Sequence, residues 1–457
     1  MEVDWSLYCP RCDFKLDASE LRSTCPRCSE PLLFEPDLSE LRGALDPEDL
    51  AARPTGVWRY RELIPVSGSP VTLGEGGTRL HRCARLGGEI GVQGLLVKDE
   101  TKNPTGCFLD RGSTVLVSRI VQEGYKGIVG TLKGNLGASL SAYAARAGIG
   151  SLIRLDGPTD PAKLYQMIAY GVEVIPPGGE LKKPEGYYEV LNSDPLLVEG
   201  EKTLAIEVAE SLGWKEPDAV VVPVGSGSLL TAVWKGFLEL REIGLTSGER
   251  ARIYGVQPHA DSNVALDLHF PKPDRKSQAE RAASETGGRI LTASDDEILE
   301  ASRRLARTEG IFAEPAAAST LAAAERLRLE GELSPGDVVV LVVTGSGLKD
   351  PSAAVKELER LHLIDAYVRG EVSGRPIGRT KTMILRLLAE RSMHGYEIWR
   401  RLRSAGLEIS LPAIYQHLKA LEEMGAVARV QSISESGRTR VVYSLTSRGR
   451  LLLAAGE

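Results

Sequence analysis

The order of hydrophobic and polar residues separates a long body, in which short strands alternate with helices, from a tail with a different pattern. Residues 219–224 and 338–343 are apolar runs almost without polar residues, which is typical of strands buried on both faces of a parallel sheet. Apolar residues four positions apart predict a helix from Leu204 to Leu212, just before the first run. This alternation predicts a doubly wound α/β domain over about residues 71–368.

After residue 368 the apolar pattern becomes that of three helices and then that of a hairpin. Ser410 is a suitable N-cap for the third helix, and Pro412 fits its first turn. A polar turn around residues 434–437 separates the two strands. The expected elements are helices over 380–390, 394–402 and 410–424 and strands over 425–430 and 440–445. Three helices and a hairpin make a winged helix-turn-helix, which we place at residues 369–457.

The N-terminal segment carries four of the six cysteines as two Cys-Pro-Arg-Cys pairs with twelve residues between them. Two such pairs can place four thiolates at the corners of a tetrahedron, the arrangement that zinc requires. The sequence therefore predicts a structural zinc ribbon over residues 1–35, with the ligands Cys9, Cys12, Cys25 and Cys28. Two disulfides are the alternative, but nothing else in the sequence indicates an oxidising compartment. Residues 36–70 read as a helical connector to the body.

Composition is that of an ordinary globular chain, with 42% hydrophobic and 26% charged residues among 457. This length predicts two to four domains. No apolar run is long enough to span a membrane, and the first residues lack the pattern of a signal peptide, so we expect a cytoplasmic protein without a membrane partner. Residues 369–457 contain fifteen Arg and Lys against eight Asp and Glu, a balance of +7 in a chain of net charge −6. A basic tail on an acidic body indicates a polyanionic partner for the tail.

The segment 98–112, KDETKNPTGCFLDRG, resembles the signature of threonine synthase, a fold-type II enzyme that depends on pyridoxal phosphate (PLP). Residues 74–78, 200–203 and 309–315 resemble further motifs of that family, in the family's order. The resemblance implies a tryptophan synthase β-like fold for the body. The family has its Schiff-base lysine where this chain has Leu109. An alkyl side chain cannot condense with an aldehyde, so no catalytic residue is assigned at this position.

The same resemblance implies a set of residues that would hold PLP without a covalent bond. The loop at 224–228 follows a buried strand and precedes a helix, so its backbone N–H groups can converge on a phosphate. A plain tight turn is the alternative for such a loop, and Ser228 replaces a residue that is usually glycine. Asn135 matches the residue that bonds the pyridine 3′-oxygen, and Thr344 matches the hydroxyl facing the ring nitrogen. The expected cofactor-binding residues are Asn135, Gly225, Ser226, Gly227, Ser228 and Thr344.

The substrate side of the expected site also departs from the family. Two hydroxyl residues that receive the substrate's anionic groups are replaced here by Leu132 and Lys133. Lys133 has three interpretations: a surface lysine, a clamp for an anion, or a relocated Schiff-base lysine, the last requiring close and directed geometry. Two departures in one pocket argue against unchanged threonine synthesis.

The tail resembles the PadR family of transcription regulators, in the stretches 394–398, 414–418 and 443–450. In that fold the third helix lies in the major groove and basic residues of the wing reach the DNA backbone. The expected DNA-contacting residues are Ala413, Gln416, His417, Lys419, Arg438 and Arg440. A protein-interaction module is the alternative. Relatives usually add a long dimerising helix after the wing, so we expect the body to form the homodimer.

Two hypotheses follow from the sequence. In the first, the chain is a transcription regulator whose non-catalytic PLP fold senses PLP, an amino acid or their adduct. In the second, it is a PLP-dependent enzyme of amino-acid (threonine) biosynthesis that uses a relocated lysine and carries its own DNA-binding domain. Leu109 favours the first hypothesis, while the nearly complete cofactor site keeps the second open.

Overall fold

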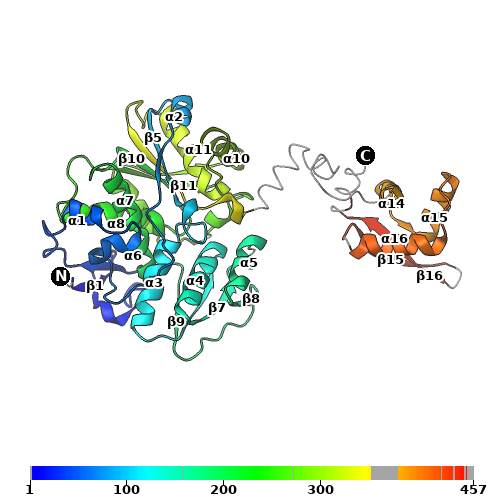
Figure 1. Cartoon of the computed structure of the whole chain (residues 1–457), viewed down its shortest axis with the longest axis horizontal. Coiled ribbons are helices and arrows are strands. Elements are labelled where there is room, and N and C mark those ends of the chain that lie inside the picture. The colour runs from blue at the N-terminus through cyan, green and yellow to red at the C-terminus, as the bar shows by residue number, and fades with distance from the viewer. Residues whose placement is uncertain are drawn as a thin grey trace. The chain divides into compact units, whose positions relative to one another are not determined.

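The computed structural model describes residues 3–157, 159–270, 272–350, 379–423, 425–435, 438–446 and 449. The chain divides into two compact units, Met1–Pro351 and Ser352–Glu457, each described here by itself (Figure 1). The domain boundary expected near residue 368 falls on the segment 351–378, outside the described residues.

A six-stranded sheet forms the larger lobe of the first unit, with the strand order β12-β11-β10-β13-β5-β4. All neighbouring strands in this sheet are parallel, except the pair of β4 and β5 at its edge, which is antiparallel. Its strands are β4 (Leu80–Arg82), β5 (Gly94–Asp99), β10 (Ala219–Pro223), β11 (Arg252–Pro258), β12 (Ile290–Ala293) and β13 (Val338–Val343). Val221 faces one hydrophobic core and Val222 the other. Because both faces are buried, the two strands β10 and β13 are continuously apolar, as predicted.

Helices cover both faces of this sheet (Figure 1). One face carries α2 (Ala84–Ile90), α10 (Asp295–Arg304) with its π-helical extension η5 (Leu305–Glu309), and α11 (Pro315–Leu329). The other carries α7 (Thr203–Ser211), α8 (Ser228–Glu242) and α9 (Lys276–Glu285). The connecting segments contain the 3-10 helices η3 (Glu100–Lys102), η4 (Leu266–Leu268) and η6 (Gly347–Lys349).

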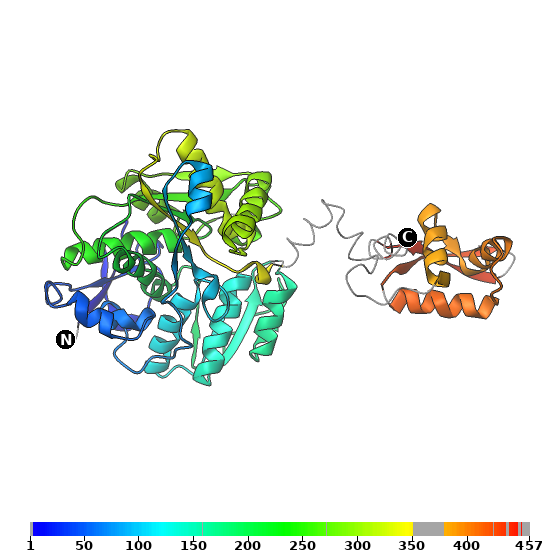
Figure 2. The same ribbon diagram turned by 45° about the horizontal axis from the view of Figure 1, so that its top comes forward.

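A parallel four-stranded sheet forms the smaller lobe, in the order β8-β7-β6-β9 (Figure 2, cyan to green). Its strands are β6 (Gly127–Leu132), β7 (Gly150–Leu155), β8 (Glu173–Ile175) and β9 (Tyr187–Glu189), and its helices are α3 (Asp110–Gln122), α4 (Gly134–Ala147) and α5 (Pro161–Ala169). Helix α6 (Pro195–Glu201) crosses α3 in close contact. A Cβ at Gly200 would lie 1.8 Å from the carbonyl oxygen of Arg111, so only glycine permits this crossing.

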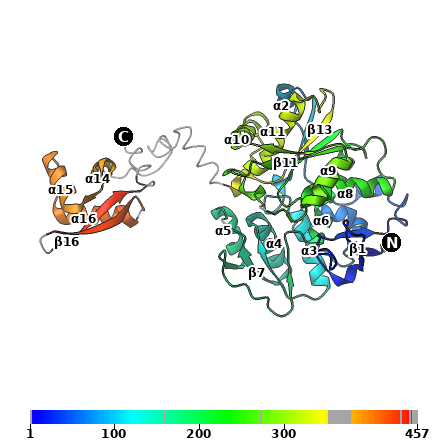
Figure 3. The same cartoon turned by 180° about the vertical axis from the view of Figure 1, so that it is seen from behind.

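The N-terminal ribbon is a small antiparallel sheet in the order β2-β1-β3. It consists of β1 (Trp5–Tyr8), β2 (Lys15–Asp17), η1 (Ala18–Glu20) and β3 (Leu33–Pro36), and the connector adds α1 (Pro47–Ala52) and η2 (Val57–Leu63). Figure 3 shows the ribbon in dark blue beside α6. The ribbon residues Leu7 and Phe34 share one hydrophobic core with α3 and α4, so the ribbon is part of the body.

Three helices of the body begin with the same local signal, an aspartate followed by proline. Asp46, Asp160 and Asp194 each accept a hydrogen bond from the backbone N–H two residues ahead, while the proline occupies the first helical position. These caps fix where α1, α5 and α6 start. Among the described residues, no helix is both long and apolar enough to cross a membrane.

The described residues of the second unit form three helices and a three-stranded antiparallel sheet, the winged helix-turn-helix that the pattern predicted. Its elements are α14 (Arg379–Glu390), β14 (Met393–His394), α15 (Gly395–Ser404), α16 (Leu411–Glu423), β15 (Val427–Glu435) and β16 (Arg438–Leu445). The short strand β14, which pairs with β16, was not predicted, because two residues carry too little pattern to recognise. Residues 436–437 of the expected polar turn lie outside the described residues.

Candidate functional site

One pocket between the two lobes of the body is lined by all the residues that the sequence predicted to hold the cofactor. They come from segments more than 200 positions apart: Asn135, Gly225, Ser226, Gly227, Ser228 and Thr344. Leu109 and Lys133 line the same pocket. The smaller lobe contributes the start of α4, and the larger lobe contributes the turn from β10 to α8 and the end of β13.

The loop from Gly225 to Gly227 has the geometry of an anion site. Gly227 is the N-cap of α8 at φ 92° and gives the helix no side-chain cap. A Cβ on Gly227 would lie 2.8 Å from the carbonyl oxygen of Arg275, and one on Gly225 would lie 2.9 Å from the ring of Phe270. Position 227 therefore requires glycine, whereas a side chain at position 225 would have to displace the ring of Phe270. The uncapped first turn of α8 directs its N–H groups and the positive end of the helix dipole toward the pocket.

Asn135 lies in a buried polar cluster that the sequence did not reveal. Its Nδ2 donates to both carboxylate oxygens of Glu314 at 3.2 Å and to Asp267 at 3.4 Å. Its Oδ1 is buried without a hydrogen-bond partner, which leaves one acceptor available for a ligand hydroxyl. Lys163 from α5 completes the cluster, with ion pairs to Asp267 and, at 3.1 Å, to Glu314. Burial raises the pKa of Glu314 to about 7, against the effect of Lys163.

Three lysines come close to the pocket, and each is engaged by the protein. Lys133, the N-cap of α4, donates to the carbonyl oxygen of His269 at 3.2 Å and lies over the ring of Phe270. Burial opposes the charge of Lys163, but the carboxylates beside it raise its pKa above the ordinary value. Lys349 donates to the carbonyl oxygen of Thr105 and to Gln166, both at 2.7 Å. These contacts hold the amino groups as hydrogen-bonded donors, not as free nucleophiles.

Leu109 is the N-cap residue of α3, with backbone angles φ −61° and ψ −18°. Cys107 beside it also lines the pocket, and burial raises the pKa of its thiol to about 12, so it is uncharged. The expectation that Leu132 alters the pocket is not supported by its position. Leu132 is the last residue of β6 and is completely buried in the core of the smaller lobe. It is not one of the residues that line the pocket.

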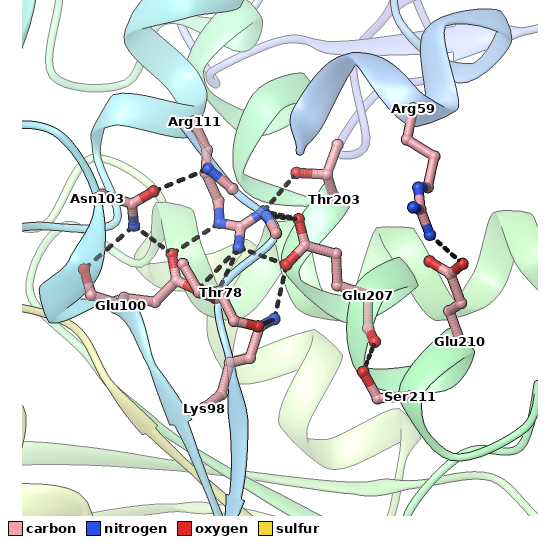
Figure 4. Close-up of polar contacts among 12 residues, drawn as sticks. Arg59, Thr78, Lys98, Glu100, Asn103, Arg111, Thr203, Glu207, Glu210 and Ser211 are labelled. Carbon is pink, nitrogen blue, oxygen red and sulfur yellow. Dashed lines mark hydrogen bonds and ion pairs between the residues drawn. The ribbon is translucent and has the colours of Figure 1, made fainter. Parts of the chain in front are cut away.

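A buried ion network fixes the start of α3, two residues after Leu109 (Figure 4). Arg111 pairs with Glu100 and with Glu207, each at 2.7 Å, and Lys98 pairs with Glu207 at 2.6 Å. All four side chains are almost completely buried. The motif at 98–112 therefore serves first to anchor the helix whose N-terminal end borders the pocket.

The four predicted zinc ligands lie together in the ribbon, and all their ligand atoms are within 4.8 Å of one another. All six cysteines are free in the structure, which is the state that zinc binding requires. The Sγ–Sγ distances of Cys9 to Cys28, Cys12 to Cys25 and Cys12 to Cys28 are 3.4, 3.6 and 3.7 Å. A tetrahedron with zinc–sulfur bonds of about 2.3 Å has edges of about 3.8 Å, so the cluster fits this ion.

In the winged helix, Gln416 and Lys419 of α16 are exposed, and Ala413 and His417 are partly exposed. The buried face of the same helix is formed by Ile414, Leu418 and Leu421. Burial and the charge of Lys381 in α14 lower the pKa of His417. Lys381 therefore lies close to His417 and is a second cation, after Lys419, that the sequence analysis did not predict for this surface. The expected wing residues Arg438 and Arg440 belong to β16, but their side chains lie outside the described residues.

Of the pocket residues that sequence reasoning missed, two stood inside recognised motifs. Glu314 belongs to the stretch 309–315 and Glu201 to the stretch 200–203, both of which resembled family motifs, so they could have been assigned. Lys163 and Asp267 carried no sequence signal, because only the folded chain brings them beside Asn135.

Comparison with known proteins agrees with this architecture. A family of pyridoxal-phosphate dependent enzymes matches residues 71–345, more than half of the chain. The transcriptional regulator PadR-like family matches residues 384–455.

Similar proteins also match over most of their own length. A threonine synthase of Methanocaldococcus jannaschii is 36% identical over 384 residues, which cover 77% of this chain and 94% of that protein. A threonine synthase of Methanosarcina acetivorans is 33% identical over 395 residues, 80% of this chain and 97% of that protein. A solved fungal L-serine ammonia-lyase from Rhizomucor miehei superposes with a TM-score of 0.54 at 20% identity, covering 64% of this chain and 99% of that one. At this identity the structural likeness concerns the fold.

Proposed function

The chain belongs to the family of pyridoxal-phosphate dependent enzymes that contains the threonine synthases, and from this premise we propose that its body is a non-catalytic sensor that controls a DNA-binding tail. Leu109 takes the place of the family's Schiff-base lysine, and PLP or its adduct with an amino acid is held without a covalent bond to the protein. The observation that carries this proposal is the presence of Leu109 in the same pocket as the complete set of predicted cofactor contacts.

The pocket residues fit PLP on two observations. The first turn of α8 is uncapped and offers N–H groups to a phosphate, and the buried Oδ1 of Asn135 lacks a partner. When bound, PLP supplies an electron sink for carbanions at the substrate's α-carbon. Using it requires a group that takes and returns protons, and the lysines near the pocket are held by other contacts. Binding is therefore better supported than turnover.

For the tail we propose binding to duplex DNA through the exposed face of α16 and the wing, with the residues Ala413, Gln416, His417, Lys419, Arg438 and Arg440. The PadR-like family match and the basic balance of the tail support this role. A homodimer formed by the body would present two tails, and its twofold symmetry would select a palindromic operator. We also propose one structural zinc ion in the ribbon, held by Cys9, Cys12, Cys25 and Cys28.

The experiment is a comparison of the unaltered protein with a Leu109→Lys variant. Each protein is mixed with PLP and treated with borohydride, and its intact mass is then measured before and after dialysis. We expect the unaltered protein to bind PLP reversibly and to retain none after reduction and denaturation. The Leu109→Lys variant should retain one PLP per chain, mapped to residue 109, because the family's geometry is restored. O-phosphohomoserine should yield no threonine with the unaltered protein.

Two results would contradict the proposal. PLP fixed by borohydride on Lys133 or Lys163 of the unaltered protein would show a relocated lysine and restore the enzyme hypothesis. Failure of PLP to bind either protein would exclude the cofactor site. A genomic pull-down tests the tail separately, and recovery of a protein in place of DNA would make the winged helix an interaction module.

A further inference from the structure

Glu201 is a buried carboxyl group at the phosphate end of the pocket, where an anionic ligand is expected. It is the last residue of α6, it is 1% exposed, and it lines the pocket. Its Oε2 accepts a hydrogen bond from the hydroxyl of Ser228 at 2.8 Å. Ser228 is the first residue of α8, so Glu201 stands directly beside the helix end that would receive a phosphate.

Within the described residues, no cation forms an ion pair with Glu201. Lys202, the next residue, pairs with Glu199 and Glu239. Arg275, next to α9, donates to the carbonyl oxygens of Leu32 and Ser193 and acts on Glu201 only through space. Arg111 of α3 forms its ion pairs with Glu100 and Glu207 in the network of Figure 4. Glu201 therefore has no ion-pair partner among these residues, and the cation that acts on it is the more distant Arg275.

A carboxylate and a phosphate cannot both be charged in such a site without a large penalty, because two like charges share a region that excludes water. Two carboxylates in contact resolve the same conflict by keeping one proton between them. Burial raises the pKa of Glu201 to about 8, while the Ser228 hydroxyl and Arg275 act in the opposite direction. Neutral Glu201 removes the like charge from beside the first turn of α8, where the ligand's phosphate would bind.

We propose that Glu201 makes the phosphate end of the pocket a proton-coupled anion site, in which a phosphorylated ligand binds only to the carboxylic acid form of Glu201. This inference rests on the proposed function, since it assumes that a phosphate occupies the first turn of α8. Below pH 8 the acid is already protonated and binding takes up no proton at this residue. Above pH 8 each ligand must bring one proton from solvent to a Glu201 oxygen, so affinity falls by about tenfold per pH unit.

The test is calorimetric titration of the full chain with PLP and with pyridoxal, which lacks the phosphate, between pH 6.5 and 9.5. Pairs of buffers with different ionisation heats report the protons taken up. We expect the loss of PLP affinity above pH 8 in the unaltered protein, with one proton taken up per ligand. Glu201→Gln keeps an acceptor for Ser228 and should remove this slope. Glu242→Gln, an exposed charge removal on the same helix α8, should leave it unchanged.

A second variant keeps the proposal falsifiable if Glu201→Gln is poorly folded. Ser228→Ala removes the hydrogen bond that stabilises the charged form, so the loss of affinity should begin at a higher pH. Parallel pH profiles for the unaltered protein and Glu201→Gln would overturn the inference and leave the PLP site standing. Equal slopes for PLP and pyridoxal would also overturn it. Absence of PLP binding at every pH would remove the proposed function and this inference together.

Discussion

Replacing Glu207 by glutamine should destabilise the body strongly, because the buried network of Figure 4 would lose its charge balance. Two cations, Lys98 and Arg111, are matched by two carboxylates, Glu100 and Glu207, and every side chain of the four is at most 6% exposed. Glu207→Gln leaves two buried cations against one carboxylate. Breaking a buried pair from one side costs about 3–5 kcal/mol. We expect a loss in that range in the free energy of unfolding.

The assay is urea unfolding followed by tryptophan fluorescence, which reports mainly on the body because four of the five tryptophans lie there. Glu210→Gln is the matched control, one turn further along α7. Its carboxylate pairs with Arg59 at 2.5 Å and accepts a hydrogen bond from Tyr60. The pair is 10% and 19% exposed and glutamine can keep both hydrogen bonds, so the loss should stay below about 2 kcal/mol.

The cause of the loss can be tested by restoring the balance. Adding Lys98→Met to Glu207→Gln leaves one cation and one carboxylate, Arg111 and Glu100, which still contact each other. The double variant should recover part of the stability lost by Glu207→Gln alone. The reasoning is refuted if the double variant, compared with the unaltered protein, loses as much stability as the two single variants lose together.

Three further outcomes are expected. Metal analysis should find one zinc per chain, and Cys25→Ser should lower that content; undiminished zinc in the variant would exclude the ribbon site. Operator affinity should fall steeply with salt, and Lys419→Ala should reduce the slope of log affinity against log salt by about 1; an unchanged slope would remove Lys419 from the DNA interface. PLP should change operator affinity by about 5- to 150-fold in a binding titration, and no change would mean that body and tail are uncoupled.

The sheet strands could be predicted because their environment repeats along them. The runs ending at Pro223 and Val343 are buried on both faces, so each position is apolar, and the structure confirms them as parallel neighbours. The helices of the tail were predicted for the same reason, since each buries one stripe of side chains. Strand β14 was missed because two residues show no period.

Only some of the residues around the pocket could be predicted from the sequence. Gly227 is recognisable because its left-handed backbone and its closeness to the Arg275 carbonyl admit no other residue, and Gly225 lies two residues before it in the same loop. Asp267 and Lys163 meet only through the fold, because they are 104 residues apart and neither belongs to a motif that indicates a ligand site. Leu132 shows the opposite error, since a change next to a motif was expected to face the ligand, whereas the strand directs it into the core.

The sensor and enzyme hypotheses differ in what they require of the cofactor's aldehyde. An enzyme needs it for covalent chemistry, whereas a sensor needs only contacts that favour one arrangement of the body over another. The pocket takes Asn135 from the smaller lobe and the Gly225 loop from the larger, so a ligand that touches both can favour one spacing of the lobes. Pyridoxine phosphate has the same ring and phosphate but an alcohol in place of the aldehyde. In an operator-binding titration it should therefore reproduce most of the effect of PLP. If PLP alone is active, and borohydride abolishes its reversibility, a covalent step at a lysine drives the response and the sensor built around Leu109 is wrong.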